Sequence, residues 1–156
     1  MTWRRRFEPI LTPLYRLHAR LVRPLTLGVR GLVVDEAGRV LLIEHTYTPG
    51  WYMPGGGVEP GEAPEHALGR EMLEEAGIEV VGRPRLVSVH DNGVRFPGDH
   101  VLIYRIDRWR QGAPTQVGEI LNLGWFAPDA LPTDTTPSTR ARIREILHGE
   151  EADLRW

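Results

Sequence analysis

The 156-residue sequence contains no cysteine, and this absence removes several kinds of chemistry at once. Disulfide bonds, thiolate metal sites and cysteine nucleophiles are all excluded. Lysine is also missing, so all 19 basic residues are arginine, a count that by itself carries no functional conclusion. No apolar stretch approaches the roughly 20 residues that a membrane-spanning helix needs. The formal net charge of −2 gives no general attraction to nucleic acid or to an anionic membrane.

Length and composition fit a single globular domain, because 41% of the residues are apolar and 26% are charged. The N-terminus lacks an uninterrupted apolar segment before a small-residue cleavage site. We therefore expect a cytoplasmic protein without a secretory signal. Residues 1–30 are nevertheless basic, since they hold seven arginines and a single acid, Glu8.

Apolar residues recur at helical spacing within the segment 9–23, at Ile10, Leu14, Leu17 and Leu21. This spacing predicts an amphipathic helix with arginines on its other side. Residues 1–24 are therefore predicted to form a basic helical extension of a domain that covers residues 25–156. Packing of this helix on the domain or on a second copy of the chain is the favoured interpretation. Association with a membrane surface is the alternative.

The rest of the chain shows strand and helix patterns in a mixed order. Aliphatic stretches at 25–34 and 40–46 flank the turn-forming sequence Asp35-Glu36-Ala37-Gly38, and together they predict a β-hairpin. Proline and glycine positions predict a first helix at about 64–76, and a second is predicted at about 138–147 with Ser138 as its N-cap. Further strands are predicted at 85–91, 101–109 and 120–126. This order indicates an α+β domain, with an α/β/α layered arrangement around a mixed sheet.

The first predicted helix follows a glycine-rich loop and combines an acidic face with an apolar one. At about 100° per residue, Glu71, Glu74 and Glu75 share one arc roughly 100° wide. The apolar residues on the neighbouring arc are predicted to pack into the core; they are Leu68, Met72, Leu73 and Ala76.

Three carboxylates on one arc carry a cost that a purely structural helix has little reason to accept. Like charges four residues apart destabilise a helix by tenths of a kcal/mol. Two of the three also lie near the helix C-terminus, where the macrodipole disfavours negative charge. A bound divalent cation with a preference for oxygen ligands would remove both costs. A bare ExxEE would usually be a solvated acidic face, so the residues around it decide between the two interpretations.

Those residues complete a longer pattern that resembles the Nudix box. The run from Gly56 to Ile78 reads glycine, five residues, glutamate, seven residues, then Arg-Glu-apolar-x-Glu-Glu-x-Gly-apolar. The filled positions are Gly56, Glu62, Arg70, Glu71, Met72, Glu74, Glu75, Gly77 and Ile78. Because so many fixed positions match at fixed spacing, the resemblance is specific. A looser similarity, which includes Gly124-Trp125-Phe126, extends over roughly residues 25–148 and leaves residues 1–24 outside.

The resemblance implies the Nudix α/β/α sandwich and a metal-dependent pyrophosphohydrolase. By analogy, Mg²⁺ or Mn²⁺ would be bound by Glu71, Glu74, Glu75 and the backbone carbonyl of Gly56. Arg70 and Glu62 would pair and orient these ligands. The reaction implied is attack of a metal-activated water on a nucleoside diphosphate linked to another moiety. The base that takes the proton of this water varies in the family.

Either Glu71 or a later loop acid is expected to be that base. Glu119, which precedes the predicted strand at 120–126, is the loop candidate, and a surface role for it is about as plausible. His45 and Tyr47 are expected to face the ligand, and Trp51 and Trp125 to stack on a base.

Each of these four has a plain packing role as its alternative. The same holds for His90 and His100, which flank a glycine-containing loop.

Three alternatives stay open beside this interpretation. One is a catalytically idle Nudix-like domain that binds a ligand or regulates a partner, although such domains usually lose box carboxylates that this chain keeps. Another is an RNA 5′-end pyrophosphohydrolase, although the only basic cluster lies in residues 1–24, away from the box. The third is removal of damaged nucleoside triphosphates. A small-molecule nucleotide is the expected partner, nucleic acid is disfavoured, and a homodimer is compatible with the sequence.

Overall fold

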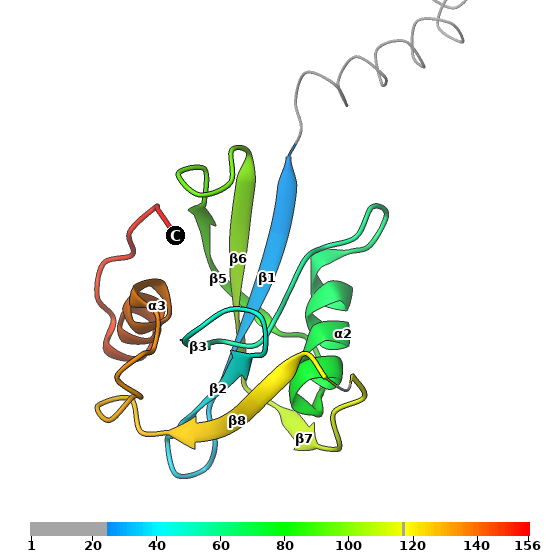
Figure 1. The fold of residues 1–156 in the computed structure, drawn as a ribbon, viewed down its shortest axis with the longest axis vertical. Coiled ribbons are helices and arrows are strands. Elements are labelled where there is room, and N and C mark those ends of the chain that lie inside the picture. Colours follow the sequence, from blue (N-terminus) through cyan, green and yellow to red (C-terminus); the bar gives the residue numbers. More distant parts are fainter. Residues whose placement is uncertain (1–24, 117) are drawn as a thin grey trace, which may run out of the picture.

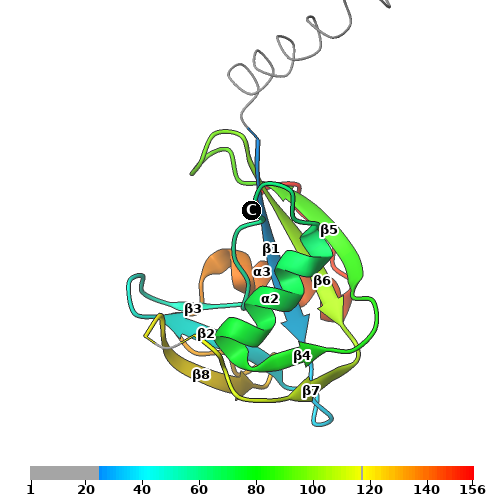
Figure 2. The ribbon, with the colours of Figure 1, turned by 90° about the vertical axis from the view of Figure 1, so that its right-hand side faces the viewer.

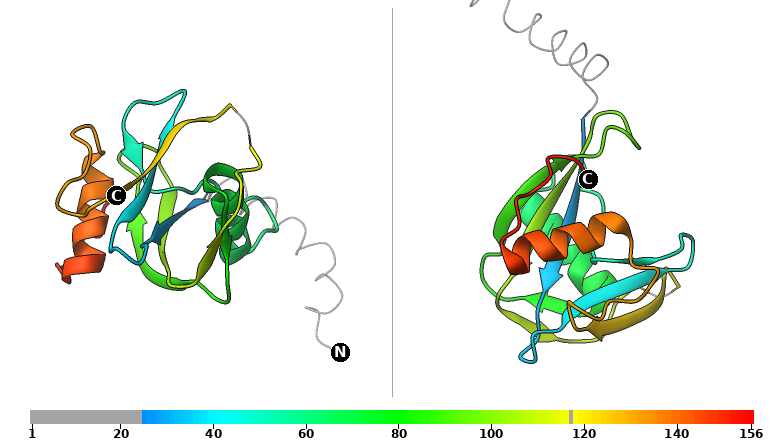
Figure 3. Two further views of the ribbon diagram at one scale, coloured as in Figure 1. Left: turned by 90° about the horizontal axis from the view of Figure 1, so that it is seen from below. Right: turned by 90° about the vertical axis from the view of Figure 1, so that its left-hand side faces the viewer.

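Two helices lie on opposite sides of the strands, which gives the predicted α/β/α layering (Figures 1 and 3). The computed structural model describes residues 25–116 and 118–156. Within them, helix α2 spans Pro64–Ala76 and helix α3 spans Pro137–His148. The helix predicted at residues 9–23 lies outside the described residues. Neither described helix has the length and apolar character needed to cross a membrane.

One three-stranded sheet runs through the centre of the molecule and mixes parallel with antiparallel pairs. Its order is β1-β6-β5, with bounds Thr26–Val33, Asp99–Ile106 and Arg85–Asp91. Strand β1 pairs with β6 in parallel, from Thr26 opposite Asp99 to Val33 opposite Ile106. Strand β5 pairs with the other edge of β6 in antiparallel orientation. The expected mixed sheet is therefore confirmed.

Two smaller antiparallel sheets complete the strand layer. The first has the order β3-β2-β8, with bounds Trp51–Tyr52, Val40–His45 and Ile120–Phe126. The second pairs β4 with β7, with bounds Ile78–Val80 and Trp109–Gln111. The prediction of one strand over 101–109 is wrong, because β6 ends at Ile106 and Trp109 belongs to a separate strand, β7.

The predicted hairpin between the first two strands is also wrong. Strands β1 and β2 belong to different sheets, and only one bridge, between Val34 and Val40, joins them where the turn begins. The turn itself forms as expected, since the Asp35 carboxylate accepts hydrogen bonds from the backbone N–H groups of Ala37 and Arg39. Beyond the turn the strands diverge because β1 is paired by β6 and β2 by β8.

Local signals account for both ends of α2. Pro64 is placed in the first turn, where the missing N–H leaves no bond unmade. Gly77 ends the helix at φ 64°, and its N–H donates to the Leu73 carbonyl at 3.1 Å. Leu68, Met72 and Ala76 are buried as predicted, whereas Leu73 is 38% exposed at the rim of the apolar face.

Helix α3 begins one residue earlier than predicted, and its N-cap is Thr136 instead of Ser138. The Thr136 side chain accepts a hydrogen bond from the Thr139 N–H at 3.4 Å. Pro137 occupies the first helical position, which requires the cap to come before it. The prediction of Ser138 as N-cap ignored this preference of the adjacent proline.

The two helices close two separate apolar clusters. Helix α2 covers a cluster that includes Val29, Leu41 and Tyr104, and helix α3 covers one that includes Leu32, Leu42 and Ile103. Successive residues of β1 and β2 thus alternate between the two clusters, as the pleat of a strand requires. The central residues of both strands are therefore buried on both faces, and the apolar face of α2 packs against β1.

Candidate active site

The glycine-rich loop before α2 is fixed along the free edge of β1. The N–H of Val29 donates to the Gly56 carbonyl at 2.9 Å, and the N–H of Gly31 donates to the Pro54 carbonyl at 2.9 Å. The N–H of Val58 donates back to the Leu27 carbonyl at 2.8 Å. The loop therefore behaves as a short extra strand, and it runs beside α2 (Figure 2).

Glu71 lies directly against this loop at Gly56. A Cβ atom placed on Gly56 would come within 2.6 Å of the Glu71 carboxylate, so only glycine leaves room for the side chain there. The predicted ligands Gly56 and Glu71 are thus brought together. The Gly56 carbonyl already accepts from Val29, but a carbonyl oxygen has a second lone pair.

Arg70 connects the acidic groups of the loop and the helix. Its Nε donates to Glu62 Oε1 and its Nη2 to Glu62 Oε2, both at 3.1 Å, in a two-pronged contact. Its Nη1 donates to Glu71 Oε1 at 2.6 Å and to Glu74 Oε2 at 3.2 Å. The hydrogen bonds from Arg70 lower the pKa of Glu62, and the same bonds raise that of Arg70. Arg70 therefore fixes the orientation of three carboxylates together.

Glu75 is the buried member of the acidic cluster, with 4% of its surface exposed. Its Oε2 accepts a hydrogen bond of 2.7 Å from the Gly55 N–H. Burial raises the pKa of Glu75 to about 7, while the Gly55 bond and the charge of Arg30 act in the opposite direction. The Gly55 hydrogen bond and the Arg30 charge do not fully offset the cost of burying the Glu75 carboxylate. A further positive charge nearby would therefore stabilise its charged form.

Arg30, on β1, is a site residue that the sequence analysis missed. Its guanidinium donates to the Met53 carbonyl at 3.1 Å and to the Gly55 carbonyl, so it holds the loop from the strand side. Burial lowers the pKa of Arg30, and the charge of Glu75 opposes this effect. The signal was available, because Arg30 is the single charge inside the aliphatic run 27–34.

His45 and Tyr47 continue the site from the end of β2. His45 is 5% exposed, and its Nδ1 lies 3.9 Å from Glu75 Oε1 without a hydrogen-bond partner in the part of the chain that the structure describes. Burial, and then Arg30, lowers the pKa of His45. The Tyr47 ring stands 4.9 Å from the His45 ring and is largely exposed.

Glu119 lies beside these residues, next to the first residue of β8. Its backbone carbonyl accepts from the Thr46 N–H at 2.9 Å. Its negative charge contributes, after burial and other nearby groups, to the raised pKa values of Glu75 and Tyr47. The structure thus places the predicted loop acid within electrostatic range of the helix carboxylates.

The two tryptophans contact other aromatic side chains. Trp51 meets Phe126 edge-to-face with ring centroids 4.8 Å apart, and Trp125 stacks on Trp109 at 5.2 Å. Both pack against the apolar clusters. These contacts match the packing alternative that the sequence left open for them.

Of the two histidines that flank loop 92–98, His90 lies on the side of the sheet away from α2. The His90 Nδ1 lies 2.8 Å from Arg142 Nη1 on the α3 side of the sheet, and His100 pairs with Asp91 across β5 and β6.

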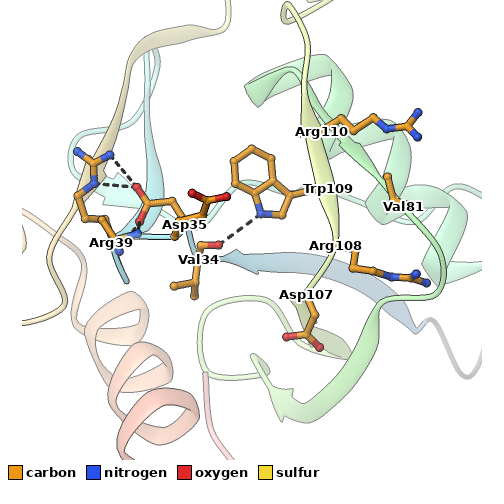
Figure 4. A pocket seen from close by; sticks show the side chains of 10 residues that line it. Val34, Asp35, Arg39, Val81, Asp107, Arg108, Trp109 and Arg110 are labelled. Carbon is orange, nitrogen blue, oxygen red and sulfur yellow. Dashed lines mark hydrogen bonds and ion pairs between the residues drawn. The ribbon is translucent and has the colours of Figure 1, made fainter.

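A separate cleft of about 870 Å³ lies next to the turn that follows β1 (Figure 4). The turn after β1 and the segment 107–110 line it, with Trp109 donating to the Val34 carbonyl at 3.4 Å. None of its lining residues belongs to the acidic cluster.

The acidic cluster has the donor set for a divalent cation, namely carboxylate oxygens and a backbone carbonyl. In the described residues no three acidic or imidazole groups already converge as a ligand set, and Arg70 engages Glu71 and Glu74. Glu71 and Glu74 would exchange that guanidinium for a cation. Two features fit such an exchange: the space that Gly56 leaves for the Glu71 carboxylate, and the incompletely balanced charge of the buried Glu75.

Comparisons with known proteins agree with this arrangement. The sequence profile of the NUDIX domain matches residues 24–147. A Bacillus subtilis protein provisionally named an 8-oxo-dGTP diphosphatase is 29% identical over 81% of this chain and 83% of its own length. An RNA pyrophosphohydrolase of Aeromonas hydrophila is 32% identical over 81% of this chain and 66% of its own length. The crystal structure of a MutT NUDIX hydrolase from Burkholderia pseudomallei is 32% identical, with a TM-score of 0.66 over 78% of this chain and 97% of that one.

Proposed function

The chain belongs to the Nudix family and is a Nudix pyrophosphohydrolase, and on this premise we propose that it uses Mg²⁺ or Mn²⁺ to hydrolyse a diphosphate bond of a small nucleotide. The observation that carries the proposal is the placement of Glu71 and Glu75 against a glycine loop that β1 holds in position. No box carboxylate has been lost, which counts against an idle domain.

Glu71, Glu74, Glu75 and the Gly56 carbonyl are the groups that would hold the cation. When bound, it would screen the phosphate oxygens and lower the pKa of a water molecule. Arg70 and Glu62 orient the carboxylates, and Arg30 holds the loop carbonyls from the other side. Glu71 or Glu119 accepts the proton of the attacking water, and His45 and Tyr47 lie where the substrate enters.

A nucleoside triphosphate is the substrate class that we propose, because the protein from Bacillus subtilis is named for such a substrate and matches most of this chain. An RNA 5′ end is the second candidate, supported by the name of the protein from Aeromonas hydrophila. Among the described residues, the basic side chains that hydrogen-bond to the loop are Arg30 and Arg70, and both are engaged by loop and helix groups. This favours a small substrate over a long polyanion.

The test is hydrolysis with Mg²⁺ and then Mn²⁺ across a panel of substrates. The panel contains nucleoside triphosphates, 8-oxo-dGTP, nucleotide sugars, dinucleoside polyphosphates and triphosphorylated RNA. Metal-dependent turnover that is fastest on a nucleoside triphosphate supports the proposal. Turnover of triphosphorylated RNA alone would instead make an RNA 5′ end the substrate. The pH profiles of kcat/KM for Glu71→Gln and Glu119→Gln then identify the base. The variant that lacks the base should lose the decrease in kcat/KM at low pH.

Replacement of Arg70 by lysine is expected to reduce kcat roughly 10–100-fold with a smaller change in KM, as for other residues that orient metal ligands. Lysine keeps the charge but cannot bridge Glu62, Glu71 and Glu74 together. The measurement is steady-state kinetics, with Arg83→Lys as the control, because Arg83 is exposed and pairs with Glu65, away from the box carboxylates. Equal kcat values for the two variants would contradict the orienting role.

Stability of the metal-free protein is expected to fall as pH rises from about 4.5 to 7. The pKa of Glu75 is about 7 in the folded state against an ordinary value of 4.5, so in this window the folded protein keeps a proton that the unfolded chain has lost. The free energy of unfolding therefore decreases with pH, by at most about 3 kcal/mol from this group.

Urea denaturation in a chelator at pH 5 and pH 8 measures this effect. Glu75→Gln should flatten the pH dependence and Glu74→Gln should keep it, because Glu74 is a third exposed. Mg²⁺ should restore stability at pH 8 in the parent protein only. The same slope in the parent and in Glu75→Gln would show that another group titrates.

A further inference from the structure

The last residue of β2, His45, carries a buried polar atom that no hydrogen bond satisfies within the described part of the chain. Its side chain is almost fully buried, and its Nδ1 has no partner there. Leaving a buried donor or acceptor without a partner costs free energy, so a polar atom of this kind calls for a reason. Packing alone does not supply one, because an apolar side chain would pack without that cost.

The strand and the neighbouring rings aim the imidazole at the acidic cluster. Alternate residues of a strand share a face, so His45 lies on the same face of β2 as Leu41, which α2 covers. The imidazole contacts two tyrosine rings, with centroid distances of 4.9 Å to Tyr47 and 5.6 Å to Tyr52. The Tyr52 hydroxyl donates to the Pro49 carbonyl at 2.9 Å, which holds that ring in place. These contacts restrict the rotation of the imidazole.

The group that the Nδ1 atom faces is the buried carboxylate of Glu75. The Glu75 Oε2 atom accepts from the Gly55 N–H, and its Oε1 lies 3.9 Å from His45 Nδ1. A separation of 3.9 Å is too long for a hydrogen bond. Two ligands of one divalent cation, each roughly 2.1 Å from it, lie about 3–4 Å apart. The separation therefore suits two groups that share one cation. A bridging water would fit the same distance, so experiment has to distinguish the two.

A nitrogen ligand bears on which cation the site selects. Mg²⁺ takes oxygen ligands, whereas imidazole favours first-row transition metals. Mn²⁺ is a first-row transition metal that also accepts carboxylates, so it suits a mixed set of ligands. We propose that His45 is a nitrogen ligand of the cation at the carboxylate site, and that the site therefore prefers Mn²⁺ to Mg²⁺. This inference rests on the metal site of the proposed function.

The first test is pulsed electron paramagnetic resonance of the full chain with less than one equivalent of Mn²⁺. A directly bound imidazole gives a strong nitrogen hyperfine coupling, which a carboxylate or a bridging water does not give. The coupling is expected in the parent protein, should disappear in His45→Asn and should remain in His148→Asn. Asparagine offers an amide oxygen close to the position of Nδ1. His148 is the matched control, because it is exposed at the end of α3.

The second measurement is competition between the two cations. Titrations of Mn²⁺ with and without Mg²⁺ give the ratio of the two dissociation constants for each protein. His45→Asn should weaken Mn²⁺ binding at least about tenfold, because even the loss of a residue that only orients a ligand weakens a metal site roughly 10–100-fold. Binding of Mg²⁺ should change less, since asparagine supplies an oxygen. His148→Asn should keep the ratio of the parent.

The outcomes separate this inference from the proposed function. Mn²⁺ binding without a nitrogen coupling, a coupling that survives in His45→Asn, or an unchanged ratio of dissociation constants would each overturn the role of His45 and leave the carboxylate site in place. No Mn²⁺ binding by the parent would overturn the metal site itself, and this inference with it. Far-UV circular dichroism checks the fold of the variants. If His45→Asn does not fold, the coupling in the parent and in His45→Gln decides.

Discussion

Glu75→Gln is expected to lower kcat at least about a thousandfold, beyond the roughly 10–100-fold typical of residues that only orient a metal ligand. The side chain is 4% exposed and held by the Gly55 N–H at 2.7 Å, so no water or neighbouring carboxylate can readily take its place. Glutamine keeps the shape but removes the negative charge. It also presents an amide group to His45, whose Nδ1 lies 3.9 Å from Glu75 Oε1.

Single-turnover kinetics and Mn²⁺ binding, measured on the same preparations, separate lost chemistry from lost metal. Glu79→Gln is the control, because Glu79 is exposed on β4, away from the loop. The kcat of Glu74→Gln should lie between those of Glu75→Gln and Glu79→Gln. The Glu74 side chain is a third exposed, and among the described residues only Arg70 pairs with it. Activity of Glu75→Gln within about tenfold of the parent would remove Glu75 from the proposed ligand set.

Gly55→Ala is expected to destabilise the fold by about 3 kcal/mol or more, whereas Gly57→Ala, two residues later, should be nearly neutral. Gly55 has φ +138°, and a Cβ atom there would lie 2.1 Å from the Val29 carbonyl oxygen. The oxygen belongs to the backbone and the position of a Cβ atom is set by its own backbone, so neither can rotate away. A Cβ atom on Gly57 would meet nothing within 4 Å, and its φ is not positive.

Thermal unfolding of the two variants gives the comparison directly, and it needs no substrate. Because Gly55 also carries the N–H that binds Glu75, the variant should lose activity even at temperatures where it remains folded. Similar melting temperatures for Gly55→Ala and Gly57→Ala would mean that the loop does not approach β1 as described.

Helix α2 could be predicted from the sequence to the residue, because its signals are local. Pro64 and Gly77 mark its ends, and the spacing of its glutamates identifies the acidic face. Which glutamate is buried was not predictable in this way, because burial of Glu75 depends on the loop and on His45, which lie far away in sequence. Arg30 stands out in the sequence as the single charge of the run 27–34, but its role was not readable there, since its partners are carbonyls of that distant loop.

The pairing of the strands could not be read from local patterns. The aliphatic stretches and turn after β1 are typical of a hairpin, yet β1 pairs with β6 and β2 with β8. Both stretches are buried on two faces, so neither shows the alternation that would have indicated a partner or a register.

The parallel pairing of β1 with β6 also has a consequence for how quickly the protein folds. Thr26 and Asp99 are 73 residues apart in sequence, so joining the two strands closes a long loop before other contacts compensate for the lost entropy. Chains with such distant contacts fold slowly, whereas α2 forms from neighbours alone. The glycine loop rests on the other edge of β1. During refolding, helix signal should therefore return before enzymatic activity, which has to await the strand from the second half of the chain.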